Sequence, residues 1–98
     1  MSTQVVVQKE LETMRNAIKR EKATKSNIFD CDAVLNHIQC MQTDGTPIGE
    51  NSPYKDFDEW KKAVLKEKEG YLSQIETIAK YKELVVAYEW YLQQNPVQ

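Results

Sequence analysis

The chain has 98 residues, of which 29% are charged and 41% hydrophobic, and its formal net charge is −2. These values are typical of a folded domain of about 100 residues, and they argue against a disordered chain and against a general affinity for nucleic acid. No apolar run reaches the roughly 18 residues that a membrane helix needs. We therefore expect a single domain over residues 1–98 that does not enter a membrane.

The first half of the chain carries two narrow apolar stripes with helical spacing. Apolar residues recur at intervals of three and four in both stripes, and the mostly charged residues 19–25 separate them. This spacing predicts helical segments over residues 4–24 and 27–42, with a kink or a short turn between them. The first stripe contains Val7, Leu11, Met14 and Ile18, and the second contains Ile28, Cys31, Leu35 and Ile38.

A loop is expected at residues 43–51. Asp44 and Gly45 form a turn dipeptide, and Pro47 and Gly49 are two further breakers of regular structure. A loop of this length reverses the chain, so we expect the second helical segment to lie antiparallel to the segment that follows.

The second half of the chain predicts one long helix over residues 53–94. Apolar residues occupy every seventh position, which indicates a helical period. Ser52 and Pro53 suit the start of this helix, and Asn95 followed by a proline suits its end. Gly70 is where the helix could turn a corner, but the seven-residue spacing continues through it and favours an unbroken helix. The row contains Phe57, Val64, Tyr71, Ile78, Val85 and Leu92.

This long helix is apolar over a wider arc than one neighbouring helix can cover. A second seven-residue row lies about 100° round the helix from the first, the apolar arc spans roughly 160°, and residues 81–92 are apolar or aromatic on nearly every face. We expect an all-α fold, either a helical hairpin or a three- to four-helix antiparallel bundle with coiled-coil-type packing, completed by oligomerisation. The second row contains Leu65, Leu72, Ala79 and Val86. The expected interface residues are Trp60, Tyr81, Val85, Tyr88, Trp90, Tyr91 and Leu92.

A basic face on the first helical segment is a second candidate site. Arg15, Lys19 and Lys22 share one side of the helix at spacings of four and three, and Arg20 is adjacent to them. Such a cluster could bind a phosphate, a nucleotide or an acidic partner. The alternative is a solvated helix surface, which is the usual outcome for charged residues.

The residues that could carry chemistry do not form a recognised site. His37 and Cys40 share a helix face, but Cys31 lies on the other side, and a structural zinc site needs four ligands. The single histidine has no orienting partner for nucleophilic catalysis, and a glycine-rich phosphate loop is absent. We therefore expect no metal, no cofactor and no enzymatic activity. The two cysteines lie too far apart along a helix to form a bridge, which indicates reduced thiols in a cytoplasmic compartment.

Two interpretations of function follow from these patterns. The favoured one is a non-enzymatic helical interaction protein, such as an adaptor, an assembly subunit or a small inhibitor, that self-associates or binds a helical partner through the long helix. The alternative is a protein that binds an anionic small ligand, such as a nucleotide, or a nucleic acid through the basic face around Arg15–Lys25.

Overall fold

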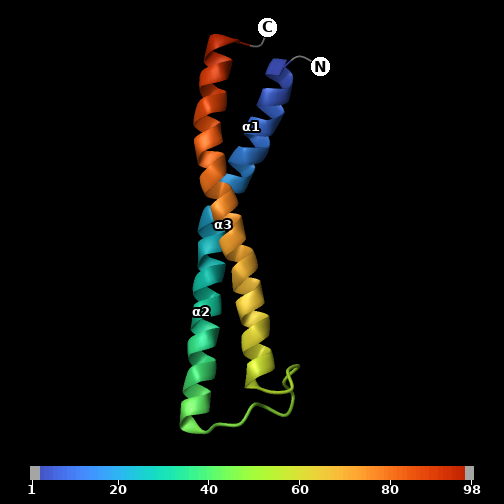
Figure 1. Ribbon diagram of the computed structural model, residues 1–98, viewed down its shortest axis with the longest axis vertical. Helices are drawn as coiled ribbons and strands as arrows, with labels where there is room; N and C mark the ends of the chain where they lie inside the picture. The colour runs from blue at the N-terminus through green and yellow to red at the C-terminus, as the bar shows by residue number, and fades with distance from the viewer. Residues whose placement is uncertain (1–2, 97–98) are drawn as a thin grey trace.

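The computed structural model describes residues 3–96, which fold into a long helical hairpin (Figure 1). Helix α1 (Thr3–Lys19) and helix α2 (Glu21–Asp44) follow each other as one bent rod, and helix α3 (Phe57–Gln94) returns antiparallel beside it. The expectation of an all-α fold is confirmed, because this part of the chain contains helices and no strand. These helices form two rods and not the three or four of a bundle.

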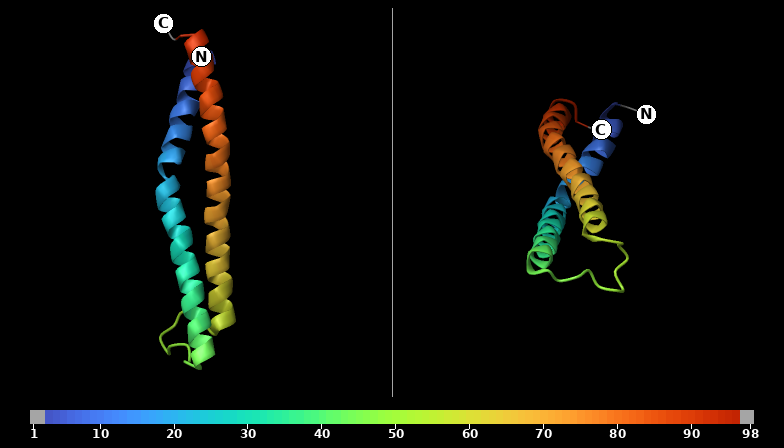
Figure 2. Two further views of the ribbon diagram at one scale, coloured as in Figure 1. Left: turned by 90° about the vertical axis from the view of Figure 1, so that its left-hand side faces the viewer. Right: turned by 60° about the horizontal axis from the view of Figure 1, so that its bottom comes forward.

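The hairpin is strongly elongated. Its Cα radius of gyration is 20.7 Å and its extents are 67 × 21 × 14 Å, whereas a compact domain of this length has a radius of gyration of about 13 Å. The two rods lie side by side and twist around each other, crossing near the junction of α1 and α2 (Figure 2). Because the molecule is only two helices wide, each helix has one side against its neighbour and its other sides towards solvent.

The bend between α1 and α2 is centred on a single residue, Arg20. The Arg20 N–H donates to the Ala17 carbonyl at 3.0 Å, which is a 3₁₀-type hydrogen bond, and the Arg20 carbonyl accepts from the Thr24 N–H at 2.9 Å. The sequence predicted this interruption between residues 24 and 27. It lies several residues earlier, and α2 begins at Glu21 without a side-chain cap.

The bend allows the buried stripe to change phase. Ile18 belongs to the seven-residue spacing of α1, and Thr24, only six residues later, begins the seven-residue spacing of α2. A straight helix would instead bring Lys25 to the seam at that level. Because the rod bends at Arg20, Thr24 is the buried residue, with 4% of its surface exposed, and its hydroxyl contacts the Gln74 side-chain oxygen at 3.5 Å.

Helix α3 begins at Phe57 and not at the expected residue 53. The reason is its N-cap, because the Asp56 carboxylate accepts a hydrogen bond from the Glu59 N–H at 2.8 Å. Ser52, the cap expected from the sequence, accepts a backbone N–H within the loop instead.

The sequence also predicts that α3 is unbroken and that it ends before Asn95, and the structure agrees on both points. The helix passes through Gly70 without interruption. It ends at Gln94, where the Asn95 backbone N–H and side-chain amide both donate to the Tyr91 carbonyl, at 2.9 and 3.1 Å.

An aromatic cluster around Trp60 holds the loop between α2 and α3. Tyr54 from the loop and Phe57 from the start of α3 stack against Trp60, with ring centroids 6.1 and 6.4 Å away. His37 of α2 contacts the same ring edge-on, with the centroids 6.5 Å apart. Trp60, which the sequence assigned to an interface between chains, is therefore half-buried among side chains of its own chain.

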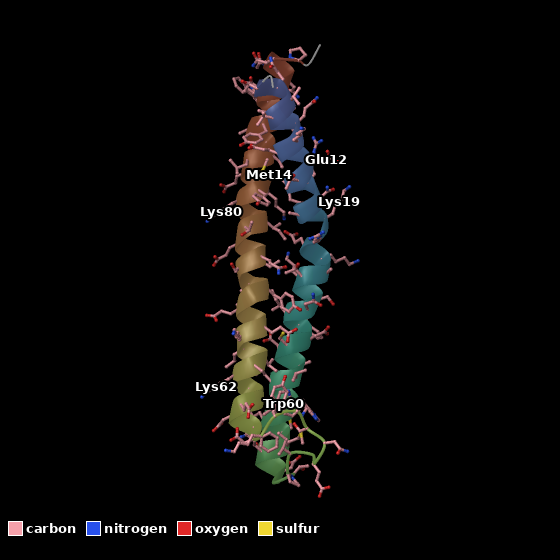
Figure 3. All side chains as sticks on the ribbon, turned by 90° about the vertical axis from the view of Figure 1, so that its right-hand side faces the viewer. Glu12, Met14, Lys19, Trp60, Lys62 and Lys80 are labelled. Carbon is pink, nitrogen blue, oxygen red and sulfur yellow. The ribbon has the colours of Figure 1, made fainter. Side chains whose placement is uncertain are left out.

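A single seam of buried side chains runs between the two rods. Ile38 is completely buried, and the other buried residues keep 4–7% of their surface exposed. The buried apolar residues are Leu11, Met14, Cys31, Ile38, Val64 and Ile78. On the opposite side of α3, Lys62 and Lys80 point away from α1 and α2 (Figure 3). Much of the surface of α3 therefore has no covering element.

Gly70 and Gly45 provide a matched pair of glycine variants. A Cβ placed at Gly70 meets nothing within 4 Å, so Gly70→Ala should raise the free energy of unfolding by about 1 kcal/mol through its better helix propensity. Gly45 ends α2 with a φ of 71°, so Gly45→Ala should lower the free energy of unfolding by about 1 kcal/mol. Urea unfolding followed by circular dichroism measures both changes. A loss of stability in Gly70→Ala would contradict a continuous α3.

Candidate functional site

Four residues on the outer side of α3 form an apolar row that α1 and α2 leave exposed. Each of them follows a residue of the seam-facing row by one position, which places the outer row about 100° round the helix from the seam. The exposed fractions of Leu65, Leu72 and Val86 are 52%, 44% and 69%, and Ala79 is also exposed. We call Leu65, Leu72, Ala79 and Val86 the outer row.

The outer row continues into further apolar surface. Trp90, about one helical turn beyond Val86, is 62% exposed. At the other end, a shallow depression of about 420 Å³ is lined by Leu65 and Leu72 together with charged side chains. Exposed apolar side chains that gather along one side of a helix mark interaction sites more often than an ordinary monomer surface.

One flank of the outer row is built from ion pairs between the two rods. Its α3 positions are 68, 75, 82 and 89, each three residues after a member of the outer row. Ile75 is half-buried, and the other three positions carry charges that pair with the bent rod. The pairs are Lys68 with Asp32 at 2.6 Å, Lys82 with Glu21, and Glu89 with Arg15 at 2.9 Å. We call these four α3 positions the paired flank.

The other flank of the outer row is acidic. Glu69, Glu76 and Glu83 each follow a member of the outer row by four positions, and all three are exposed. None of them takes part in an ion pair within residues 3–96. We call these three residues the acidic flank. The outer row thus lies between a flank that contains two lysines and a flank of three glutamates.

The interface residues expected from the sequence are mostly half-buried. Tyr81 and Tyr88 border a cavity of about 360 Å³ whose other wall is α1, and a hydrogen bond with Glu10 raises the pKa of the Tyr88 hydroxyl. Of the expected set, Trp90 is the exposed member. The half-buried members are Trp60, Tyr81, Val85, Tyr88, Tyr91 and Leu92. The sequence revealed the outer row as a second seven-residue row, but its members were not assigned to an interface.

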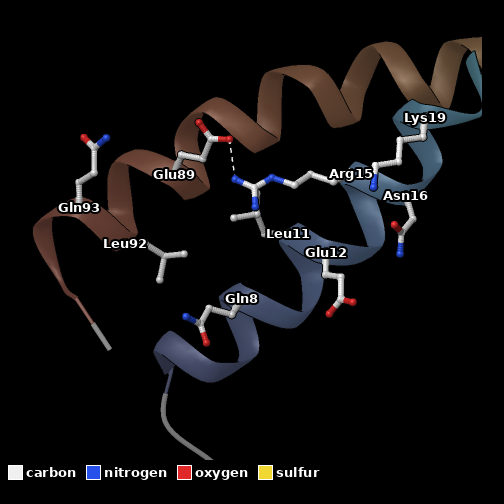
Figure 4. A pocket seen from close by; sticks show the side chains of 9 residues that line it. All are labelled: Gln8, Leu11, Glu12, Arg15, Asn16, Lys19, Glu89, Leu92 and Gln93. Atoms are coloured by element: carbon white, nitrogen blue, oxygen red, sulfur yellow. Dashed lines mark hydrogen bonds and ion pairs between the residues drawn. The ribbon is translucent and has the colours of Figure 1, made fainter. Parts of the chain in front are cut away.

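A groove of about 820 Å³ opens between α1 and the C-terminal part of α3 (Figure 4). Arg15 reaches across this groove, and its Nη2 donates to Oε1 of Glu89 at 2.9 Å. Lys19 and Glu12 line the α1 side. Two basic and two acidic side chains therefore border the groove, so that its formal charge is balanced.

The structure distributes the expected anion-binding residues over three places. Arg15 and Lys19 line the groove between α1 and α3, whereas Arg20 lines a smaller cavity of about 210 Å³ at the bend. Lys22 is exposed near the start of α2. The basic face therefore borders two separate cavities and does not converge on one.

The two cysteines occupy different environments. Cys31 is buried in the seam, and burial, followed by the nearby carboxylates of Glu67, Asp32 and Asp30, raises the pKa of its thiol. Cys40 is exposed. Within residues 3–96, no three His, Cys, Asp or Glu side chains gather closely enough to hold a metal ion.

Comparisons of this chain with protein-family models, with curated proteins and with solved structures gave no match. None of the helices in the described part of the chain combines the length and the apolar character that a membrane span requires. The outer row and its two flanks are consequently the features from which a function can be inferred.

The two thiols should differ in reactivity. In the native protein at neutral pH, a disulfide reagent should modify Cys40 at the rate of an ordinary thiol and Cys31 at least about tenfold more slowly, because the thiolate is the reactive form and burial disfavours it. The release of the chromophore measures both rates. Cys40→Ser should leave only the slow phase, and denaturant should abolish the difference. Equal rates in the native protein would contradict the burial of Cys31.

The pair between Glu21 and Lys82 should make part of the stability depend on acid. The hydrogen bond with Lys82 is the main cause that lowers the pKa of Glu21 from its ordinary value of 4.5. A carboxylate with a lowered folded-state pKa stabilises the fold above its unfolded pKa, and this contribution is lost as the pH falls through the folded pKa. Lys82→Gln should therefore melt below the wild type at neutral pH, and the difference should shrink once the pH is below 4.5. A difference that stays constant down to acidic pH would contradict this role.

Proposed function

We propose that this chain is a non-enzymatic helical interaction protein that self-associates through the outer row of α3. The observation that carries the proposal is the exposure of Leu65, Leu72 and Val86, at 52%, 44% and 69%, along a row of constant seven-residue spacing. An assembly subunit is the role that needs only this surface. An adaptor or a small inhibitor would use the same surface for a helix of another protein.

The apolar side chains on the outer side of α3 can supply the free energy of association. Complete burial of a leucine or valine side chain contributes about 1.5–3 kcal/mol, and those of the outer row are about half exposed. Together with Trp90, two copies would gain about 10 kcal/mol. Association opposes this gain with a cost of about 4–15 kcal/mol.

The repeat of α3 also supports a role in association. One seven-residue row of this helix packs in the seam, and the outer row repeats the same spacing on an adjacent side. A helix with two adjacent apolar rows is typical of a bundle, in which it touches two neighbours. The hairpin supplies one of these neighbours, and a second chain would supply the other.

The environment of the buried thiol favours a non-enzymatic role. The pKa of Cys31 is raised, chiefly by burial. The pKa of Tyr71, which lines the same small cavity, is also raised, chiefly by the hydrogen bond that its hydroxyl donates to Glu67 at 3.1 Å. Both groups are therefore held in their protonated forms, whereas a nucleophile is activated by a lowered pKa.

An anionic ligand for the basic face, the alternative function, has less support. Arg15 is engaged by Glu89, and the groove that it shares with Lys19 has equal numbers of basic and acidic side chains. A site for a phosphate would require uncompensated positive charge.

Light scattering coupled to gel filtration tests the self-association. At about 50 µM, a concentration that detects association of micromolar affinity, the wild type should have at least twice the 11.4 kDa mass of one chain. Leu72→Gln combined with Val86→Gln should reduce the mass to that of the monomer. Helicity should be retained, because glutamine is a good helix former.

The matched control is Ala87→Gln, which changes the exposed residue next to Val86 and lies about 100° further round α3. This variant should associate like the wild type. A monomeric wild type at the same concentration would contradict the proposed function, and equal association of all variants would exclude the outer row as the interface.

A further inference from the structure

We infer that the partner of the outer row is a second copy of this chain that lies parallel to the first and in register with it. Each residue of the outer row then faces its own counterpart. This arrangement rests on the self-association proposed above and adds to it the orientation of the two chains. The charges on the two flanks of the outer row favour the parallel over the antiparallel orientation of the two chains.

The two flanks present opposite charges at the same levels of α3. Lys68 and Lys82 belong to the paired flank, and Glu69 and Glu83, the residues that directly follow them, belong to the acidic flank. Consecutive residues differ by about 1.5 Å in height along a helix. At each of these two levels, a lysine and a glutamate therefore lie on opposite sides of the outer row.

A parallel pair brings these opposite charges together. When the two-fold axis runs along the helices, the paired flank of one copy faces the acidic flank of the other. Lys68 then faces Glu69 of the second copy, and Lys82 faces Glu83 of the second copy, and each contact occurs twice by symmetry. Such complementarity fixes orientation and register more than it adds to affinity. One kind of like-charge contact remains near the loop, where Lys62 faces Lys61 of the second copy, and it also occurs twice by symmetry.

An antiparallel pair brings like charges together. When the two-fold axis is perpendicular to the helices, each flank faces the same flank of the other copy. With the outer rows centred on each other, Lys68 faces Lys82 of the second copy, while Lys61 meets the opposite charge of Glu89 of the second copy. On the acidic flank, Glu76 faces its own counterpart and Glu69 faces Glu83 of the second copy. The apolar rows still meet in this arrangement, so the charges are what distinguishes it from the parallel one.

The shape of the hairpin permits the parallel pair. Helices α1 and α2 pack on the seam side of α3, about 100° round the helix from the outer row. Lys62 and Lys80, which lie beyond the outer row, point away from both of these helices (Figure 3). The seven-residue spacing of the outer row also matches the left-handed winding of two parallel helices.

Cysteine cross-linking in the full chain tests the orientation. In a Cys40→Ser background, Leu65→Cys and Val86→Cys are prepared separately and oxidised mildly, alone and as an equal mixture. In the parallel arrangement each variant should form a disulfide-linked dimer on its own. Ala87→Cys is the matched control, because its side chain lies beside the outer row, and the background protein reports any reaction of Cys31. Both should remain without cross-links.

The outcomes separate the orientation from the proposed function. Efficient cross-linking of each variant alone supports the parallel pair. Cross-linking that occurs only in the mixture would show the antiparallel pair, and it would overturn the inference while leaving self-association in place. A chain that scatters light as an oligomer but cross-links in neither way would also overturn it. A monomer in every experiment would overturn both proposals.

Mixing charge variants provides a second measurement. In the parallel pair, Glu69→Lys combined with Glu83→Lys should weaken self-association by about tenfold, because four attractive contacts become repulsive. Mixed dimers with the wild type should then be of intermediate stability. In the antiparallel pair, the mixed dimer would instead be tighter than either pure dimer. Sedimentation of the two proteins, separately and together, distinguishes these patterns.

Discussion

The seam between α3 and the bent rod is the contact on which the whole structure depends, and it is narrow. A helix of 38 residues can pack only one side against a single antiparallel neighbour, so the hairpin of residues 3–96 buries six apolar side chains and, among these residues, completely encloses only Ile38. Other large apolar side chains of α3, from Leu65 to Trp90, stay in contact with water. Small domains already bury a low fraction of their surface, and an open two-helix form buries less. A second layer of helices is the natural way to complete such a core.

The bend at Arg20 shows how the seam sets the shape of the first rod. Two stretches that each repeat every seven residues are joined with a spacing of six, and the chain absorbs the difference at one residue. The buried hydroxyl of Thr24 contacts Gln74 at this level, which places a polar layer inside an otherwise apolar seam. A polar contact in a helical seam can specify register at some expense of stability, because a shifted α3 would leave the buried hydroxyl without a partner.

The elements with the strongest periodicity were predictable from the sequence, and the departures from prediction have local causes. The seven-residue row of α3 indicated an unbroken helix through Gly70, and the structure contains one. The predicted break between residues 24 and 27 lies too late, because the charged run of residues 19–25 contains the bend itself and the phase of the buried residues sets its position. The start of α3 was placed too early because Asp56 outcompetes Ser52 as a cap. The sequence assigned the interface mainly to aromatic residues of α3, yet aromatic character does not determine which side of the helix a residue occupies. Trp60 packs on its own loop, whereas Trp90 and the row that begins at Leu65 are exposed.

In the proposed pair, one row of α3 packs within the hairpin and the adjacent outer row contacts the second chain, and Lys68 and Lys82 lie between these two rows. Lys68 and Lys82 are already held by Asp32 and Glu21 of α2, so their side chains need little further ordering to meet a carboxylate from another chain, and less conformational entropy is lost. Exposed ion pairs contribute little to affinity and weaken with salt, whereas burial of apolar surface does not. In the proposed pair, the apolar row would therefore determine whether two chains associate, and the charged flanks would determine in which orientation they do so.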